Sequence, residues 1–331
     1  MADGHGAPFP GLIDLQVNGT HGIDFSAEGL TVDDCLQAFD LIRAAGVAAF
    51  LPTVITSPVD RCKANLATIV AAATRYRHPD LIAGVHLEGP FLDPTPGAIG
   101  AHNPDWVHSP DPSLFDALQD AAGGMLRMLT VSADIIGIEP LIAHAAAKGV
   151  TVSLGHQMAG YTAMRQAADA GATLLTHLGN GLPHEVNRHE NPLLAGLAER
   201  RLGAMIIADG HHLPDELALL ILRVKGLEHT IAVSDAAPVV GLPPGRYTTL
   251  GNSVEVTAEG LVVNPGTRYL AGSGRTLLDC VNRLAGTGLF SCDELVTMAM
   301  RNPARIVGID PDTLSGPGLR YDPRAGRFVA A

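Results

Sequence analysis

Four polar residues stand just after short apolar runs of the sequence, and their types are those that a hydrolytic metal site requires. Glu88, His156, His177 and Asp235 follow runs rich in Leu, Ile, Val or Thr. Imidazole nitrogens and carboxylate oxygens bind a borderline cation such as Zn²⁺, and a further carboxylate can act as a base. Each run is typical of a buried parallel strand. We therefore expect the four side chains to lie where such strands end.

A repeated strand-then-helix pattern indicates the elements that would position these residues. Between the apolar segments, helical spacing predicts helices over 31–45, 58–77, 136–148, 160–170 and 214–225. Cap signals support three of them: Thr31 with Asp34 three residues on, and Pro58 and Pro214 in first turns. The predicted strands are eight in number, at about 12–18, 48–54, 81–87, 126–132, 150–155, 173–177, 203–208 and 230–234.

Eight such units are typical of an α/β fold of the (β/α)8 TIM-barrel type, in which catalytic residues gather at the carboxyl ends of the strands. An open, doubly wound sheet is the alternative architecture. Its dinucleotide site would need a GxGxxG turn, whereas the first strand runs into Gln16-Val17-Asn18-Gly19. The pattern therefore favours the barrel.

The pattern changes after Asp235. A Pro- and Gly-rich turn at 238–245 precedes alternating segments around 246–250 and 253–257, which predict a β-hairpin. Helical spacing returns near 275–286 and 292–308. We expect one domain over 1–331, with a β-hairpin excursion at about 246–270 and a short C-terminal stub at about 310–331.

Composition excludes several classes of protein. The formal charge is −12, from 34 acidic and 22 basic residues, and no basic block could follow a nucleic-acid backbone. The first ten residues carry no leader pattern, and no apolar stretch reaches the roughly 18–20 residues that span a bilayer. Four scattered cysteines suggest reduced thiols. We expect a cytoplasmic protein without nucleic-acid or membrane partners.

A series of short motifs resembles the N-acetylglucosamine-6-phosphate deacetylase family of the amidohydrolase superfamily. Several motifs are weak alone, but their order and spacing together are specific. They run from about Pro10 to Arg305: Pro10-Gly11-Leu12-Ile13-Asp14-Leu15-Gln16-Val17-Asn18-Gly19, His86-Leu87-Glu88-Gly89-Pro90-Phe91-Leu92, Gly100-Ala101-His102-Asn103-Pro104, Gly155-His156, Thr176-His177-Leu178, Ala208-Asp209-Gly210-His211-His212, Ser234-Asp235-Ala236, Leu270-Ala271-Gly272-Ser273 and Asn302-Pro303-Ala304-Arg305.

The resemblance assigns roles at the reacting end of the site. It implies that Glu88, His156 and His177 hold one divalent metal ion, Zn²⁺ first, with Fe²⁺, Co²⁺ or Mn²⁺ as alternatives. It implies that Asp235 is the general base, which takes a proton from water and passes it to the departing amine. His102 would polarise the acetyl carbonyl and stabilise the oxyanion.

The resemblance also assigns supporting residues. Many amidohydrolases carry a His-x-His pair for a second metal on the first strand. Here Gln16 and Asn18 stand in its place, so we expect a mononuclear site with these two amides, and His86, behind the ligands. The implied contacts to substrate are Ala101, Asn180, Gly181, His212 and, from the neighbouring subunit of a homodimer, Arg188.

The implied activity is hydrolysis of the N-acetyl amide of an amino-sugar phosphate, N-acetylglucosamine 6-phosphate first, to acetate and the amine. Two alternatives stay open: an amidohydrolase for another N-acyl sugar or a cyclic amide, and a non-catalytic sugar-phosphate-binding protein. Members of the family carry longer ends that form a small β-sandwich. This chain has little of either end, so we expect that module to be absent or vestigial.

Plainer interpretations accompany some of these residues. A lone histidine at a strand end is usually a hydrogen-bonded loop residue, and His86 is as compatible with the packed core as with the site. His211 reads as a neighbour of His212 rather than a participant. His184 and His189 read as solvated or interface residues. Asp209 is as compatible with capping the turn that follows it as with contacting substrate.

Overall fold

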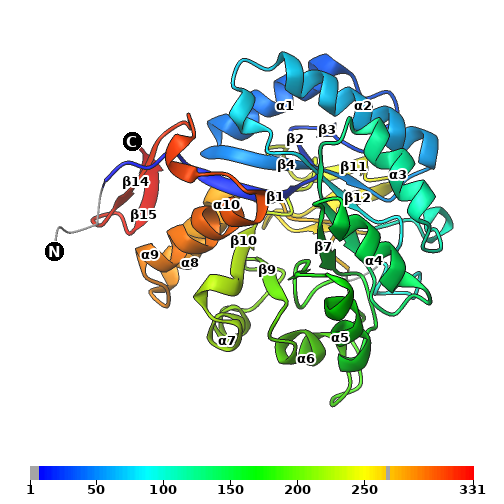
Figure 1. Cartoon of the computed structure of the whole chain (residues 1–331). Coiled ribbons are helices and arrows are strands. Elements are labelled where there is room, and N and C mark those ends of the chain that lie inside the picture. The colour runs from blue at the N-terminus through cyan, green and yellow to red at the C-terminus, as the bar shows by residue number, and fades with distance from the viewer. Residues whose placement is uncertain (1–6, 266–268) are drawn as a thin grey trace.

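Eight parallel strands form a nearly closed barrel in this computed structural model, which describes residues 7–265 and 269–331 (Figure 1). Each strand pairs with the next along the chain, in the order that a (β/α)8 barrel requires. The fold expected from the sequence is thereby confirmed. The barrel strands are β1 (Leu12–Val17), β4 (Val47–Ile55), β5 (Val85–Glu88), β6 (Leu126–Val131), β7 (Thr151–Leu154), β8 (Leu174–Leu175), β9 (Gly203–Ile207) and β10 (Thr230–Val233).

The first and last strands meet mainly at their carboxyl ends. The backbone N–H of Asn18 donates to Ala236 O at 2.9 Å, and Val17 forms a parallel bridge with Ala236. Deeper in the barrel, Asp14 Oδ1 accepts from the backbone N–H of Ser234 at 3.1 Å. This closure brings the end of β1, with Gln16 and Asn18, beside the end of β10, which Asp235 follows.

Helices cover the barrel on its outside (Figure 1). The Thr31–Asp34 capping box is present, and Pro214 is the cap residue before its helix. Strand β5 begins later than predicted, because Leu81 belongs to the 3-10 turn η1 (Pro79–Leu81). The covering helices are α1 (Val32–Ala44), α2 (Val59–Arg75), α3 (Pro112–Ala121), α4 (Ile138–Ala147), α5 (Tyr161–Ala170), α6 (Pro192–Ala198), α7 (Asp215–Lys225) and α8 (Leu277–Thr287).

Two of these helices, α3 and α6, were not predicted from the sequence. Each begins with a proline after a capping side chain, Asp111 and Asn191 respectively. Both are short, at 10 and 7 residues, so they carry few apolar positions from which helical periodicity could be read. Their start signals alone were available.

The helical segment predicted at 292–308 is interrupted. It comprises α9 (Cys292–Val296), a π-helical turn η4 (Thr297–Arg301) and α10 (Asn302–Val307). Asn302 is buried, and its amide donates to the carbonyls of Leu227 and Thr230, both at 2.7 Å. The Asn302-Pro303-Ala304-Arg305 motif thus attaches α10 to the amino end of β10, whereas Asp235 follows the carboxyl end of that strand.

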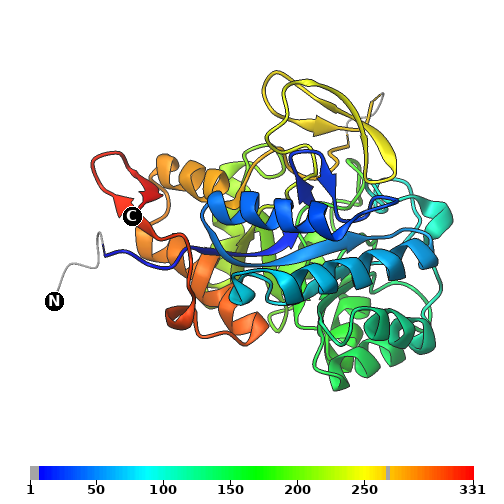
Figure 2. The ribbon, with the colours of Figure 1, turned by 90° about the horizontal axis from the view of Figure 1, so that it is seen from above.

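A β-hairpin excursion lies over one side of the barrel mouth (Figure 2). It consists of β11 (Gly245–Thr249), β12 (Asn252–Val256) and β13 (Val262–Val263), joined in one antiparallel sheet. Buried Asp24, in the small β2 (Gly19–Thr20) and β3 (Ile23–Asp24) hairpin, accepts from Thr249 Oγ1 and Leu250 N. Part of the predicted 246–270 excursion, residues 266–268, lies outside the described residues.

The C-terminal stub forms a second small sheet away from the excursion (Figure 2). Strands β14 (Leu319–Asp322) and β15 (Arg327–Ala330) pair in an antiparallel hairpin, and Phe9 bridges to Leu319. The Asn282 amide of α8 binds both backbone groups of Phe328. This small sheet fits the expected vestigial module, since it docks on the barrel rather than forming a separate core.

Among the described residues, no helix is long and apolar enough to cross a membrane. All four cysteines are free thiols. The remaining short helices are η2 (Pro104–Trp106), η3 (Leu227–His229) and η5 (Pro311–Thr313).

Candidate metal centre and surrounding pocket

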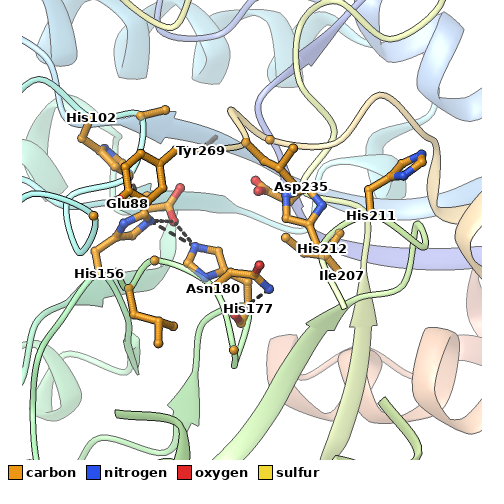
Figure 3. Close-up of a pocket in the computed structure, with 18 of the residues that line it drawn as sticks. Glu88, His102, His156, His177, Asn180, Ile207, His211, His212, Asp235 and Tyr269 are labelled. Atoms are coloured by element: carbon orange, nitrogen blue, oxygen red, sulfur yellow. Dashed lines mark hydrogen bonds and ion pairs between the residues drawn. The ribbon is translucent and has the colours of Figure 1, made fainter. Parts of the chain in front are cut away.

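Glu88, His156 and His177 converge at the carboxyl ends of β5, β7 and β8 (Figure 3). Glu88 is the last residue of its strand, and each histidine stands two residues after its own. Glu88 Oε1 lies 3.2 Å from the Nε2 atoms of both histidines, and these two nitrogens lie 3.1 Å apart. All three side chains are buried.

The three donor atoms fit a single divalent cation. Ligands held tetrahedrally at about 2.0–2.2 Å from one ion lie roughly 3.3 Å from each other, close to the separations seen here. The set of two imidazoles and one carboxylate leaves a coordination position open, as in catalytic rather than structural zinc sites. It is the one cluster of this kind among the described residues.

Electrostatics also favour a cation at this place. Burial alone would raise the pKa of Glu88, but hydrogen bonds from His156 and His177 hold the pKa well below its usual range. His156 Nδ1 lies 2.9 Å from Ala98 O, so the ring donates there and its Nε2 lone pair faces the other ligands. An ion would take the place of the protons that Glu88 and the imidazoles otherwise share.

The backbone is left-handed at three of the converging residues. His156, His177 and Asp235 have φ angles of 52°, 33° and 49°. Non-glycine residues in this region cost on the order of 1–3 kcal/mol each and cluster at functional sites. Each of the three residues stands two positions after its strand, and the left-handed turn there directs the side chain towards the cavity (Figure 3).

Two amides, Gln16 in β1 and Asn18 just after it, lie directly behind the site. Gln16 Nε2 donates to Glu88 Oε1 at 3.1 Å, and Asn18 Nδ2 donates to Asp235 Oδ1 at 2.8 Å. His86 lies deeper: its ring nitrogens contact Leu15 O at 3.1 Å and Thr130 Oγ1 at 2.8 Å. Burial lowers the pKa of His86 to about 4, so it is a neutral residue of the barrel interior.

Asp235 faces the ligands from across the cavity (Figure 3). Burial, and then the charge of Glu88, raise its pKa to about 6, although His177, His212 and Asn18 act in the opposite direction. A carboxylate with a pKa near neutrality can both accept and release a proton at physiological pH. The pKa of Asp235 is therefore shifted upwards, whereas the pKa of Glu88 is shifted downwards.

His102 comes from the long loop between β5 and α3. Its Nε2 lies 3.2 Å from His156 Nε2, and its buried Nδ1 has no hydrogen-bond partner within the described chain. Burial, and then the charge of His156, lower the pKa of His102 to about 3. The ring is therefore neutral and carries one N–H that it can donate. Asn252 of β12 holds this loop by donating to Ala101 O at 2.6 Å.

A cavity of about 590 Å³ opens above these residues. Ala101, Asn180, Gly181 and His212 line it, as the resemblance implied. Arg188 does not line the cavity of its own chain and is exposed. The cavity wall therefore contains four of the five expected substrate contacts, and the fifth is on the outer surface.

Two aromatic rings that the sequence did not single out as site residues form part of the cavity wall. His184 and Tyr269 stack with ring centroids 4.8 Å apart and an interplanar angle of 1°. They come from the loop after β8 and from the end of the excursion, 85 positions apart in the chain by their numbers. No sequence pattern links them, so only the fold could bring them together.

Asp209 caps the turn after β9, as expected, but it also contacts a site residue. Its Oδ1 accepts from the backbone N–H groups of His211 and His212, while its Oδ2 lies 2.8 Å from His212 Nδ1. These contacts, chiefly those with His212, hold the pKa of Asp209 well below its usual range despite burial. The capping role and the contact to the site are thus not exclusive.

The chain is similar to characterised deacetylases over nearly its whole length. It is 32% identical to an N-acetylgalactosamine-6-phosphate deacetylase of Escherichia coli O157:H7 over 303 residues, which cover 91% of this chain and 78% of that one. It is 33% identical to the N-acetylglucosamine-6-phosphate deacetylase of Bos taurus over 314 residues, or 91% and 74% of the two chains. No protein-family model matches the chain.

Solved structures agree with these relatives. An N-acetyl-D-glucosamine-6-phosphate deacetylase from Mycobacterium smegmatis superimposes with a TM-score of 0.86 at 28% identity, covering 98% of this chain and 88% of that one. A mutant of the same enzyme in complex with N-acetyl-D-glucosamine-6-phosphate gives 0.87. The two comparisons agree on one group of enzymes.

Proposed function

The chain belongs to the N-acetylglucosamine-6-phosphate deacetylase family of the amidohydrolase superfamily, and on that premise we propose that it hydrolyses N-acetylglucosamine 6-phosphate to glucosamine 6-phosphate and acetate. The convergence of Glu88, His156 and His177 opposite Asp235, in a cavity of sugar size, is the observation that carries the proposal. Members of this superfamily are metal-dependent, and the donor set supports that chemistry here.

Glu88, His156 and His177 would hold one divalent ion, Zn²⁺ first. When bound, such an ion polarises a carbonyl and makes water acidic enough to attack at neutral pH. Gln16 supports Glu88 by donating to the same oxygen that faces both histidines. Binuclear amidohydrolases bind a second metal ion through two imidazoles of the first strand. This chain has neutral amides, Gln16 and Asn18, at those positions, so the imidazole ligands for a second ion are missing.

Asp235 and His102 would carry the proton and charge transfers. Asp235 accepts a proton from the attacking water and delivers it to the leaving nitrogen, and its raised pKa suits both steps. Asn18 holds one carboxylate oxygen, so the other remains available. His102, as a neutral donor, binds the amide oxygen as negative charge develops on it.

The phosphate would be bound by residues of the cavity wall. Asn180, Gly181 and His212 offer an amide, a backbone N–H and an imidazole there. Arg188 would reach this group from a second copy of the chain, because it lies outside the cavity of its own. A homodimer would then be needed for full affinity.

One alternative substrate has a specific observation in its favour. The relative from Escherichia coli O157:H7 is named for N-acetylgalactosamine 6-phosphate, which differs in the configuration of one hydroxyl group. A purely binding role has less support, because a binder has no use for a buried carboxylate with a raised pKa, such as Asp235, opposite a metal site.

The test is acetate release by zinc-loaded protein. N-acetylglucosamine 6-phosphate, N-acetylgalactosamine 6-phosphate and unphosphorylated N-acetylglucosamine would be compared, each beside a chelator-treated control. We expect zinc-dependent acetate release from all active substrates, with the highest kcat/KM for N-acetylglucosamine 6-phosphate. Preference for the galacto sugar would change the substrate but keep the reaction, and absence of release from all three would refute the proposal.

A further inference from the structure

A buried hydrogen-bonded chain runs from Ser273 through Asp209 to His212, behind the cavity wall. Ser273 Oγ donates to Asp209 Oδ2 at 2.8 Å, and the same carboxylate oxygen lies 2.8 Å from His212 Nδ1. Only 1% of the Asp209 side chain and 5% of the His212 side chain are exposed. A carboxylate so buried must act through the groups that it contacts.

The two oxygens of Asp209 have separate partners. Oδ1 accepts from two backbone N–H groups and shapes the turn, whereas Oδ2 accepts from two side chains. The hydroxyl of Ser273 must donate to Asp209, because an ionised carboxylate oxygen can only accept, and it also accepts from the backbone N–H of Arg275 at 3.1 Å. With Ser273 and the turn satisfied, the remaining contact of Asp209 determines which nitrogen of His212 carries a proton.

This contact orients His212 towards the cavity. Because Nδ1–H donates to Asp209, Nε2 is the ring nitrogen left for the cavity, which His212 lines. Nε2 has no hydrogen-bond partner in the described part of the chain. When an anionic group approaches Nε2, the ring can bind it as a donor only in its doubly protonated form, and Asp209 balances that second proton.

The chain also gives a physical account of the Leu270-Ala271-Gly272-Ser273 motif. Ser273 N donates to Asp235 O at 2.8 Å, and a parallel bridge joins Ser273 to Ala236. Gly272 has a φ of +68°, and a Cβ there would lie 2.9 Å from Asp235 O. The segment can therefore pack against the Asp235 turn and bring its serine to Asp209.

We propose that Asp209, assisted by Ser273, is a positioning residue that fixes the orientation and proton arrangement of His212 and thereby determines the preference for a phosphorylated sugar. The inference rests on the proposed function, in which His212 contacts the phosphate. Asp209 itself touches no substrate, so its effect is on substrate binding rather than on the reacting amide.

Asp209→Asn tests this role with little change in shape. Its amide oxygen can keep the two backbone N–H groups, while its NH₂ group replaces the Oδ2 acceptor and reverses the tautomer of His212. Loss of a hydrogen bond to a charged group weakens binding by roughly 10- to 100-fold. We expect KM for N-acetylglucosamine 6-phosphate to rise by about that factor, with kcat changed by less than about threefold.

Three comparisons complete the kinetic test. Ser273→Ala should raise KM in the same direction by a smaller factor, and His211→Ala, which removes the adjacent ring but leaves the chain of contacts intact, should leave KM unchanged. On unphosphorylated N-acetylglucosamine, kcat/KM of Asp209→Asn should stay near the kcat/KM that the wild type shows on the same sugar. Equal losses on both sugars, or a KM within about twofold of wild type for the phosphorylated sugar, would overturn the proposal.

Nitrogen-15 NMR of the zinc-loaded protein gives a readout that does not depend on turnover. The His212 signal, assigned with His212→Gln, should show a protonated Nδ1 in the wild type and a protonated Nε2 in Asp209→Asn. The same tautomer in both proteins would refute the positioning role. If the wild type hydrolyses none of the sugars but the tautomers differ as expected, the proposed function fails while the positioning role stands.

Discussion

Single residues with the same functional group acquire different properties in this barrel. Glu88 is held ionised by two imidazoles, Asp209 by backbone donors and His212, and Asp235 is shifted the other way by burial and by the charge of Glu88. Three carboxylates thus serve as a candidate ligand, a positioning residue and a candidate base. Environment rather than residue type separates the roles.

Asp235→Asn tests the base directly. The amide keeps the size of the side chain, and its oxygen can still accept from Asn18, but it cannot take a proton. We expect the metal content to stay near that of wild type and kcat to fall by about 10²–10⁴-fold or more. Metal analysis beside acetate release checks this, and turnover equal to wild type would remove Asp235 from the mechanism.

Asp14 offers a stability test that is independent of turnover. Burial raises its pKa from 3.8 to about 6, although Ser234 and Gln16 act against the shift. A raised carboxyl pKa means that the folded chain holds the proton more tightly, so the stabilisation is complete below about pH 4 and is lost as pH rises through 6. At neutral pH the ionised group costs up to about 3 kcal/mol.

Asp14→Asn should therefore raise Tm at pH 7–8, and the gain should shrink towards pH 5. Both backbone donors reach the single atom Oδ1, which an asparagine oxygen can replace. Thermal unfolding across this pH range gives the measurement, with exposed Asp80→Asn as the control. A gain in Tm that grows as pH falls would contradict the raised pKa of Asp14.

At the scale of elements, the loops after the strands hold the site in shape. The loop between β5 and α3 presses Gly100 against His156: a Cβ there would lie 2.9 Å from His156 Cε1. The excursion holds the same loop through Asn252, and Asp24 anchors the excursion in turn. Elements outside the barrel therefore position His102 and one ligand ring.

Gly100→Ala should lower metal affinity by roughly 10- to 100-fold, as loss of ligand orientation does in other sites. Gly29→Ala is the matched control, because both glycines have a positive φ, +61° and +76°, but a Cβ at Gly29 meets nothing within 4 Å. Both variants should lose similar stability from the left-handed backbone. Zinc titration distinguishes them, and equal affinities would show that the His156 ring tolerates the added methyl group.

At the scale of the whole molecule, the proposed dimer predicts complementation between two impaired variants, measured at a substrate concentration below the KM of Arg188→Ala. Arg188→Ala lacks the phosphate contact that it would supply to its partner, and Asp235→Asn lacks its own base. A mixed dimer contains one site with both groups intact, so mixing should restore part of the activity on the phosphorylated sugar. Each variant alone and Arg188→Ala mixed with wild type are the controls, and no recovery after verified exchange would place Arg188 outside the site.

The β14–β15 sheet is a second whole-molecule feature. Phe328 is 1% exposed and packs edge-on against Phe9 and Tyr321, with ring centroids 5.9 and 5.2 Å away. Phe328→Ala should cost up to about 3–5 kcal/mol of stability while metal content and KM stay unchanged, since no residue of this sheet lines the cavity. Exposed Arg327→Ala is the control, and a changed KM would show that the sheet is coupled to the site.

Local patterns in the sequence determined the elements and the residues at their ends. Short apolar runs and cap residues are properties of a few neighbouring positions, so they predicted eight strands, six of the eight covering helices and the polar residues at strand ends. The short helices α3 and α6 and the π-helical turn were missed, because elements of 10 residues or fewer show little periodicity and owe their stability to packing against the barrel.

Only the tertiary structure decided how these residues act together. The 3.1–3.2 Å separations at the metal centre, the His184–Tyr269 stack and the Ser273–Asp209–His212 chain all join segments distant in sequence. The opposite pKa shifts of Glu88 and Asp235 likewise come from burial and from neighbours across the barrel. A sequence specifies which groups are present, but distances and desolvation arise only when the closing barrel brings its strand ends together.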